Sequence, residues 1–229
     1  MKNLKLFINI DVLKIFALIT MSLDHVAKYL LEQGGVRECF IGLGRTSFPI
    51  FSFLLMMHLA KMNIYKKYIT RLGLFGFIAF LLMFVFSFVF EDIKIFPLNI
   101  MVSFLLAVLF FKVVSIIQKE DGPKYIKIMM WLFSFFVFSF LSLVLDYGLY
   151  GFLFLVFMCL YFKEKNKLIL GIILLLSCLI NINGYWFMSL LTTIVLFFNQ
   201  YDAKYKRIIN KWWIFYIYYP LHLLIIFLI

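Results

Sequence analysis

Apolar stretches long enough to cross a membrane recur along the whole chain, and only short polar breaks separate them. A membrane-spanning helix needs ~20 mainly apolar residues. Hydrophobic residues make up 66% of the 229 residues and charged residues only 14%, whereas a soluble domain carries ~25% charged residues. A water-soluble fold could not bury this much apolar surface. The sequence therefore predicts an all-α, polytopic integral membrane helical bundle, with residues 1–229 forming a single domain.

The apolar runs predict about nine transmembrane helices, with eight and ten as the neighbouring possibilities. The sixth to eighth runs are short for a full span, which indicates tilted, broken or partly interfacial segments. Because Phe occupies 31 positions and small residues are few, we expect packing by bulky interdigitating side chains rather than close contacts between small residues. The expected helices are 7–27, 46–63, 68–90, 96–117, 125–145, 148–162, 167–182, 185–200 and 211–229.

The placement of basic residues predicts the orientation of the bundle. Cytoplasmic loops retain Lys and Arg, whereas exported loops are depleted of them. If the nine helices alternate in direction, most of the 22 basic residues lie on the same side as the N-terminus. The loops on the other side hold only Lys28, Arg37, Arg45 and Lys94. We therefore expect a cytoplasmic N-terminus and a C-terminus on the outer side.

The formal net charge of +11 would suggest a nucleic-acid partner in a soluble protein. Here the positive residues lie mainly in the inner loops, where anionic lipid and the orientation rule account for them. We therefore expect membrane lipid, and no nucleic acid, as the partner of this charge. Three cysteines, Cys39, Cys159 and Cys178, match no metal-ligand spacing and form no even disulfide set, so no metal is expected.

Polar residues inside the apolar runs are the functional candidates, because burying them in a membrane is expensive. The first helix holds the densest set. Asp11 and Lys14 are three residues apart, so they share a helix face and can neutralise one another. His25 follows Lys14 by close to three helical turns, so the two side chains point the same way about 16 Å apart. Asp24 is turned about 100° away from His25 and is not assumed to be its partner.

A purely structural interpretation of these residues stays open. The first pair would then be an interfacial ion pair, and the acidic residue and histidine further along would cap the helix. His222 has a similar interpretation, because Pro220 frees a backbone carbonyl in the last helix to which a histidine can bond. Asp146 would be a turn residue between two helices, and His58 a packing residue.

Several short motifs follow one another along the chain. The first is Asp11-Val-Leu-Lys14, followed by an apolar run that ends in Leu23-Asp24-His25. The later motifs are Gly44-Arg45-Thr-Ser-Phe-Pro49-Ile-Phe, Lys67-Tyr68-Ile-Thr-Arg71-Leu, Pro97-Leu98-Asn99, Asp146-Tyr147-Gly148-Leu-Tyr150-Gly151 and Tyr218-Tyr219-Pro220-Leu221-His222-Leu223. In this order they resemble the TraX family of pilin acetylases over nearly the whole chain. More distantly, the spacing of Lys14 and His25 resembles the first helix of the acyltransferase family 3 membrane enzymes.

The resemblance implies a membrane-bound acyltransferase of the bacterial cytoplasmic (inner) membrane. It would transfer acetyl from cytosolic acetyl-coenzyme A to an oxygen or nitrogen acceptor at the outer face, either a pilin-like or other exported peptide or a cell-surface glycan. His25 would be the general base, since histidine is suited to take a proton near neutral pH. Arg45 would donate to the developing oxyanion, and Asp24 and Asp146 would belong to the same catalytic site.

The resemblance also implies a donor site at the inner face. Lys67 and Arg71, one helical turn apart, would hold the phosphates of acetyl-coenzyme A, and Lys14 would be a further cofactor-binding residue. His222 and Asp11 are additional candidates for the site.

Two other classes of function stay open at this point. One is a small transporter or flippase for a hydrophobic or lipid-linked substrate, although such proteins often contain inverted repeats and no convincing repeat is found. The other is a non-catalytic assembly factor, which would need none of the histidines.

Overall fold

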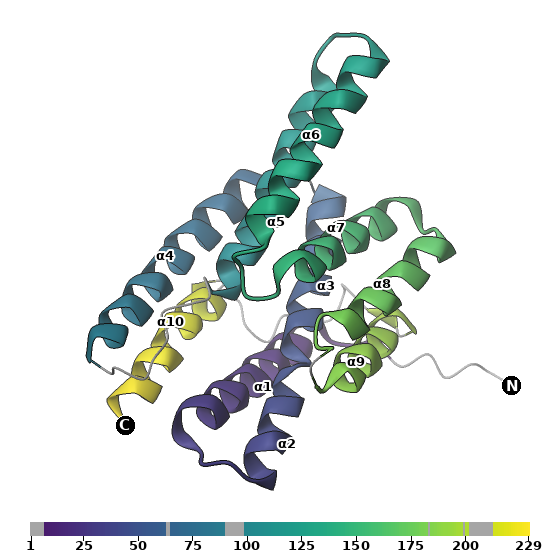
Figure 1. Cartoon of the computed structure of the whole chain (residues 1–229). Coiled ribbons are helices and arrows are strands. Elements are labelled where there is room, and N and C mark those ends of the chain that lie inside the picture. The colour runs from purple at the N-terminus through teal and green to yellow at the C-terminus, as the bar shows by residue number, and fades with distance from the viewer. Residues whose placement is uncertain (1–6, 63–64, 90–98, 183, 199, 202–212) are drawn as a thin grey trace, which may run out of the picture.

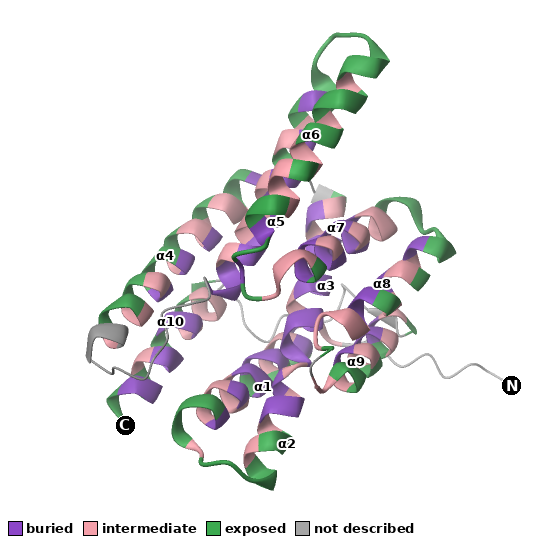
Figure 2. Cartoon of the chain, in the orientation of Figure 1, coloured by how far each residue is buried: buried purple, intermediate pink, exposed green. Residues whose placement is uncertain are grey.

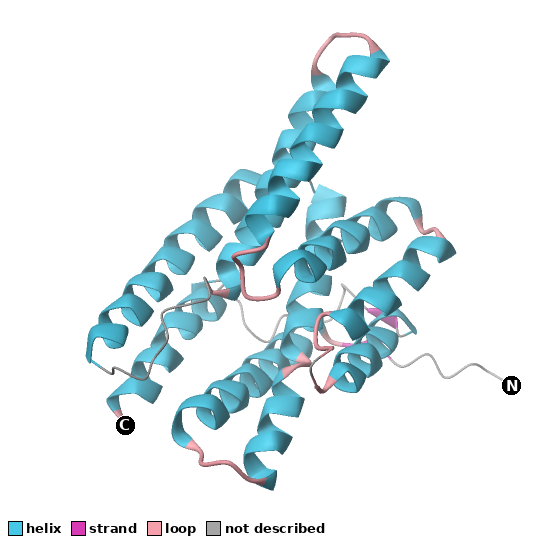
Figure 3. Ribbon diagram, in the orientation of Figure 1, coloured by secondary structure: helices cyan, strands magenta, loops and turns pink. Residues whose placement is uncertain are grey.

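The computed structural model describes residues 7–62, 65–89, 99–182, 184–198, 200–201 and 213–229 (Figure 1). Within these ranges the chain forms ten helices and one parallel pair of two-residue strands, and helix dominates the whole picture (Figure 3). In chain order the elements are β1 (Phe7–Ile8), α1 (Ile10–Leu30), α2 (Gly35–Gly44), α3 (Ser47–Met62), α4 (Tyr65–Val89), α5 (Ile100–Lys119), α6 (Lys124–Ser142), α7 (Gly148–Glu164), α8 (Lys167–Leu179), α9 (Trp186–Phe198), β2 (Gln200–Tyr201) and α10 (Trp213–Leu228).

The helices follow the predicted order, and the all-α architecture is confirmed. Only two residues separate α2 from α3, and Gly35–Lys61 is apolar enough to count as one long segment. With that pair taken as one broken helix, the described residues contain nine helical units near the nine predicted positions. The prediction of a polar loop before residue 46 was wrong, because α2 occupies most of it. Arg37 and Glu38 make this segment look like a loop, yet the segment is helical and packs on α1.

Asparagine side chains begin three of the helices. Asn9, Asn99 and Asn166 each accept a hydrogen bond from the backbone amide two residues further on, which satisfies an otherwise unpaired donor of the first turn. The Asn99 amide also donates to the Gly76 carbonyl of α4 at 2.9 Å. The last residue of the Pro97-Leu98-Asn99 motif therefore fixes the start of α5 to α4, whereas Pro97 and Leu98 lie outside the described residues.

Within the part of the chain that the structure describes, four segments are long and apolar enough to cross a membrane. The shorter α8, α9 and α10 are also apolar. On α6 the side chains of Phe133, Phe136 and Phe140 are 71%, 71% and 66% exposed, and Figure 2 shows exposed residues along the length of this helix. Water would not favour such a surface, whereas lipid does, so the chain is a membrane protein. The four segments are Gly35–Lys61, Tyr65–Phe86, Ile100–Lys119 and Lys124–Ser142.

The core lies where α3, α5 and α7 meet, and large side chains fill it. Phe48, Phe110 and Phe154 are almost fully buried. The ring centroid of Phe48 lies 4.0 Å from that of Tyr147 and 5.7 Å from that of Phe154. Such aromatic pairs contribute ~0.5–1.5 kcal/mol beyond the burial of their area. Packing by bulky side chains, as predicted, therefore holds in the centre of the bundle.

The contact between α1 and α2 differs from this expectation, because it is a close approach at a glycine. A Cβ atom on Gly44 would lie only 2.2 Å from the Cβ of Asp24 in α1. Just beyond, the hydroxyls of Thr20 and Thr46 are 3.2 Å apart, and Arg37 donates to the Ala27 carbonyl at 3.1 Å. These pairs show that α2 runs antiparallel to α1. The turn between α1 and α2 lies at one end of the bundle, which we call the hairpin end.

Replacing Gly44 by alanine is therefore expected to lower the stability of the fold. The added methyl group forces α2 away from α1, and overpacking of this kind typically costs ~1–3 kcal/mol. Gly171→Ala in α8 is the matched control, because nothing lies within 4 Å of the Cβ it adds. The measurement is the thermal unfolding midpoint of each detergent-solubilised variant. Equal midpoints for the two variants would contradict the close approach.

The last helix, α10, runs parallel to α1 and lies between α1 and α4 (Figure 1). Near the start of both helices, the Lys14 ammonium lies 4.9 Å from the ring centroid of Phe215. Further along, the hydroxyls of Ser22 and Tyr218 are 2.8 Å apart. Parallel first and last helices agree with an odd number of alternating helical units.

Candidate functional site

Two histidines from opposite ends of the chain meet near the hairpin end. Nδ1 of His25 in α1 lies 2.7 Å from Nε2 of His222 in α10, and the two rings stack with centroids 4.9 Å apart at an angle of 21°. His222 is buried, whereas His25 is half-buried. We call these two residues the histidine pair.

The hydrogen bonds of the pair determine which nitrogen atoms carry protons. Nδ1 of His222 lies 2.9 Å from the Tyr218 carbonyl oxygen, and a carbonyl can only accept, so this nitrogen is the donor. In neutral His222 the other nitrogen, Nε2, must then accept from Nδ1 of His25. Neutral His25 consequently carries no proton on Nε2, and no described protein atom is hydrogen-bonded to that nitrogen. The pair presents one free basic nitrogen.

The structural interpretation of His222 holds in part. Its ring does bond to the backbone of its own helix, but through the Tyr218 carbonyl rather than the carbonyl one turn before Pro220, which is that of Tyr216. Because Nε2 of His222 also pairs with His25, both nitrogen atoms of His222 have partners. His222 is therefore unable to act as the base without breaking a hydrogen bond.

Aromatic residues surround the histidine pair. The ring centroids of Tyr29 and Tyr219 lie 6.2 Å and 6.3 Å from that of His25. Tyr218 stacks on His222 at 5.4 Å and is in turn anchored through its hydroxyl to Ser22. Tyr218 and Tyr219, which belong to the aromatic stretch at the start of α10, therefore pack against α1.

An ion cluster of Asp24, Lys28 and Arg45 lies beside the histidine pair. Asp24 is buried and forms ion pairs with Lys28, one turn further along α1, and with Arg45, at 3.6 Å. Arg45 lies at the junction of α2 and α3 rather than in a surface loop. It is close enough for its charge to act on His25. The ion-pair partners of Asp24 in this cluster are cations rather than the neighbouring histidine.

Asp146 lies in the turn between α6 and α7, within electrostatic range of the ion cluster. Asp146 is an exposed residue, but the chain packed around its carboxyl limits hydration and raises the pKa of Asp146. The charges of Lys28 and Arg45 oppose this increase, and Asp24 adds to it. In the same motif Gly148 has a φ of +53°, a backbone conformation that favours glycine, and it begins α7.

The residues expected to bind the donor lie near the opposite end of α1, α4 and α10. Lys14 forms its predicted ion pair with Asp11 at 2.9 Å. The Arg71 guanidinium lies 5.9 Å from the ring centroid of Tyr216 in α10, so an aromatic ring of the last helix stands beside it. Lys67 is exposed in the first turn of α4. These three cations border α10 or the start of α4. None of them lines either of two cavities, of about 450 Å³ and 400 Å³, that lie among the described residues.

Among the described residues, His58 forms no hydrogen bond or ion pair with the histidine pair, the ion cluster or the residues expected to bind the donor. Its Nδ1 lies 2.7 Å from the Leu54 carbonyl of its own helix, in keeping with a packing residue. Sequence patterns did not predict the contributions of Ser22, Lys28 and Tyr218. Lys28 could have been found, because it lies one helical turn after Asp24, whereas the pairing of Ser22 with Tyr218 spans 196 positions and leaves no local signal.

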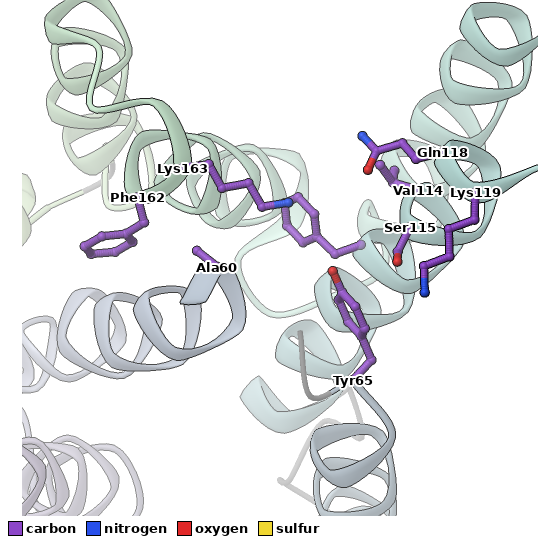
Figure 4. Close-up of a pocket in the computed structure, with 9 residues that line it drawn as sticks. Ala60, Tyr65, Val114, Ser115, Gln118, Lys119, Phe162 and Lys163 are labelled. Carbon is purple, nitrogen blue, oxygen red and sulfur yellow. The ribbon is translucent and has the colours of Figure 1, made fainter. Parts of the chain in front are cut away.

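Two of the open cavities among the described residues are of similar size. One, of about 400 Å³, is bordered by Arg45, Tyr150 and the turn between α8 and α9. It therefore shares Arg45 with the ion cluster at the hairpin end. The other, of about 450 Å³, lies at the far end of the bundle (Figure 4).

The fold and the site together define an all-helical membrane protein with a pair of histidines and an ion cluster at one end of its bundle. The family model described as TraX protein matches residues 9–229, and the chain belongs to the TraX family. A similar protein is the probable fimbrial assembly protein FimC, serogroup H1, of Dichelobacter nodosus. It is 26% identical over 228 residues, which cover 92% of this chain and 91% of that protein. No solved structure gives a significant match.

Proposed function

We propose that this protein is a multi-pass acetyltransferase of the bacterial cytoplasmic membrane. It transfers acetyl from cytosolic acetyl-coenzyme A to an amine or hydroxyl acceptor at the outer face. The observation that carries the proposal is the free Nε2 of His25, which is held in one protonation form by His222. His25 directly follows Asp24, the ion-pair partner of the Arg45 guanidinium. A base, a residue that orients it and a nearby cation are the parts that acyl transfer requires.

The proposed reaction uses these groups in order. The acceptor nitrogen or oxygen attacks the thioester carbonyl carbon, and its proton passes to Nε2 of His25. Arg45 donates to the carbonyl oxygen as negative charge develops there. The carbon–sulfur bond then breaks, and the sulfur of coenzyme A takes the proton from His25. Asp24 holds the cations of the cluster in place through its ion pairs, and Asp146 acts on the same cations through its charge.

Donor and acceptor are proposed to lie on opposite sides of the membrane. With the N-terminus in the cytoplasm, the hairpin end faces outward, and the ends that carry Lys67, Arg71 and Lys14 face inward. These cations suit the phosphate groups of the donor. The thioester end must then reach between the helices toward His25.

The acceptor is proposed to be a pilin-like or other exported peptide, or a cell-surface glycan. The name of the Dichelobacter nodosus relative supports a role in pilus assembly, and the family supports the same context. That name also favours a second candidate, a non-catalytic assembly factor. The two candidates differ in one respect, since an assembly factor needs no free basic nitrogen.

A topology experiment tests the orientation. A reporter that is active only outside the cytoplasm should work when fused after Gln33 or Ile229, and should fail after Asp121 or Lys165. The positive-inside rule gives the reason. The reversed pattern would invert both faces, and the donor would then approach from the wrong side.

The transfer itself is tested with purified protein, isotope-labelled acetyl-coenzyme A and three acceptors. These are a peptide with a free N-terminus, the same peptide with a blocked N-terminus, and a soluble oligosaccharide. Label on the first alone indicates an amine acceptor, and label on the third indicates a hydroxyl acceptor. No label on any acceptor, with donor binding intact, would favour the assembly factor.

A further inference from the structure

The cavity at the end of the bundle opposite the histidine pair contains polar groups that the proposed reaction does not use. It has a volume of about 450 Å³ and lies between the ends of α3, α5 and α7 and the start of α4 (Figure 4). Its walls are partly apolar. The polar residues that line it are Tyr65, Ser115, Gln118, Lys119 and Lys163.

The charge of this lining is entirely positive. Lys119 comes from α5 and Lys163 from α7, and no acidic residue lines the cavity. Within the described ranges neither lysine forms an ion pair with a carboxylate. The Lys163 ammonium instead lies 5.7 Å from the ring centroid of Phe111. Two ammonium groups without counter-charges beside a partly apolar wall favour an anion.

The neutral groups of the lining are hydrogen-bond donors of the kind that phosphate oxygens accept. Tyr65 is buried and its hydroxyl is hydrogen-bonded to Ser115, so both hydroxyls have fixed places. Figure 4 shows the hydroxyls of Tyr65 and Ser115 and the Lys119 ammonium directed toward a common space, which Lys163 approaches from the other side. Several donors around one space suit a group with several acceptor oxygens.

Positive charge continues around the rim of the cavity. Lys61 directly follows the lining residue Ala60, and Lys165 follows Lys163 by two positions. The surrounding chain limits hydration of the Lys165 ammonium, and the charge of Lys61 acts in the same direction, so the pKa of Lys165 is lowered. An anion bound nearby would relieve this repulsion.

We propose that the cavity is a binding site for a phosphate group, held by Lys119 and Lys163 with the hydroxyls of Tyr65 and Ser115. Two ligands carry such a group at a membrane surface: the nucleotide end of coenzyme A and the head group of an anionic phospholipid. The first ligand rests on the proposed function, and the second does not.

Binding to the purified full-length protein in detergent tests this site. Calorimetric titrations use adenosine 3′,5′-bisphosphate for the first source and a short-chain phosphatidylglycerol for the second, with short-chain phosphatidylcholine as the reference lipid. The double variant Lys119→Gln, Lys163→Gln should weaken binding of the recognised probe roughly tenfold per lysine, because each removes a charge-assisted hydrogen bond. The matched control is Lys112→Gln, Lys124→Gln, which removes equal charge from exposed residues outside the lining.

Each result of these titrations either supports the phosphate site or overturns it. A loss specific to the cavity variant, restored by Lys119→Arg, Lys163→Arg, supports the site, and the responding probe identifies the source. If neither probe binds, or if both bind the cavity variant as well as the control, the inference is overturned. It is also overturned if only Lys67→Ala, Arg71→Ala abolishes binding. Because the titrations measure no transfer, an inactive protein that binds phosphatidylglycerol here would contradict the proposed function alone.

Discussion

Replacing His25 by alanine should lower acetyl transfer by ~10²–10⁴-fold, the usual contribution of a general base, and should leave the fold and donor binding intact. The reason is that Nε2 of His25 is the free nitrogen of the histidine pair. His25 is only half-buried, so its removal leaves no large cavity. The measurement is the initial rate of transfer by purified protein, with donor binding and the elution profile followed in parallel.

His58→Ala provides the control for this prediction. His58 bonds only to the Leu54 carbonyl of its own helix, so its loss should leave the transfer rate within about threefold of the parent rate, well inside the range of a missing base. If His25→Ala retained a comparable rate, His25 would not be the base.

Removing the ring nitrogen atoms of His222 should have the second-largest effect. In His222→Phe the stacked ring persists, but Nδ1 of His25 loses its acceptor, and both neutral forms of His25 become available. The expected loss in kcat is about 10–100-fold, which corresponds to one hydrogen bond of ~1–3 kcal/mol. The KM for the acceptor should change little, because His222 is buried and does not touch it.

His222→Gln separates positioning from packing. The amide oxygen of glutamine can take the place of Nε2 and accept from Nδ1 of His25, so this variant should recover most of the rate lost in His222→Phe. If His222 had only a structural role, His222→Phe would retain a higher transfer rate than His222→Gln, because phenylalanine fills the buried site better than glutamine does. Equal rates for the two variants, with equal thermal stability, would also contradict the positioning role.

The sequence predicted the helices well because their apolar runs are long and their ends carry strong local signals. Asn9, Asn99 and Asn166 each begin a helix where the pattern places one. The exception is α2, whose charged residues look like part of a loop. Gly44 allows close contact of α2 with α1, and such a tertiary contact leaves no periodic signal in a segment of 10 residues.

The candidate site was predictable in part. Helical geometry predicts that His25 and Lys14 point the same way and that Lys14 pairs with Asp11. The structure shows the ion pair of Lys14 with Asp11. The bond between His25 and His222 joins residues 197 positions apart. Only the arrangement of α1 beside α10 brings them together, and composition and spacing contain no information on which helices become neighbours.

Mass spectrometry of exported peptides and surface glycans tests the central claim most directly. The samples come from cells that lack the protein, cells that carry it, and cells that carry the His25→Ala variant at equal abundance in the membrane. The account predicts an acceptor that bears an acetyl group only in cells with the parent protein. The same acetylated acceptor at the same level in cells with the His25→Ala variant would contradict it.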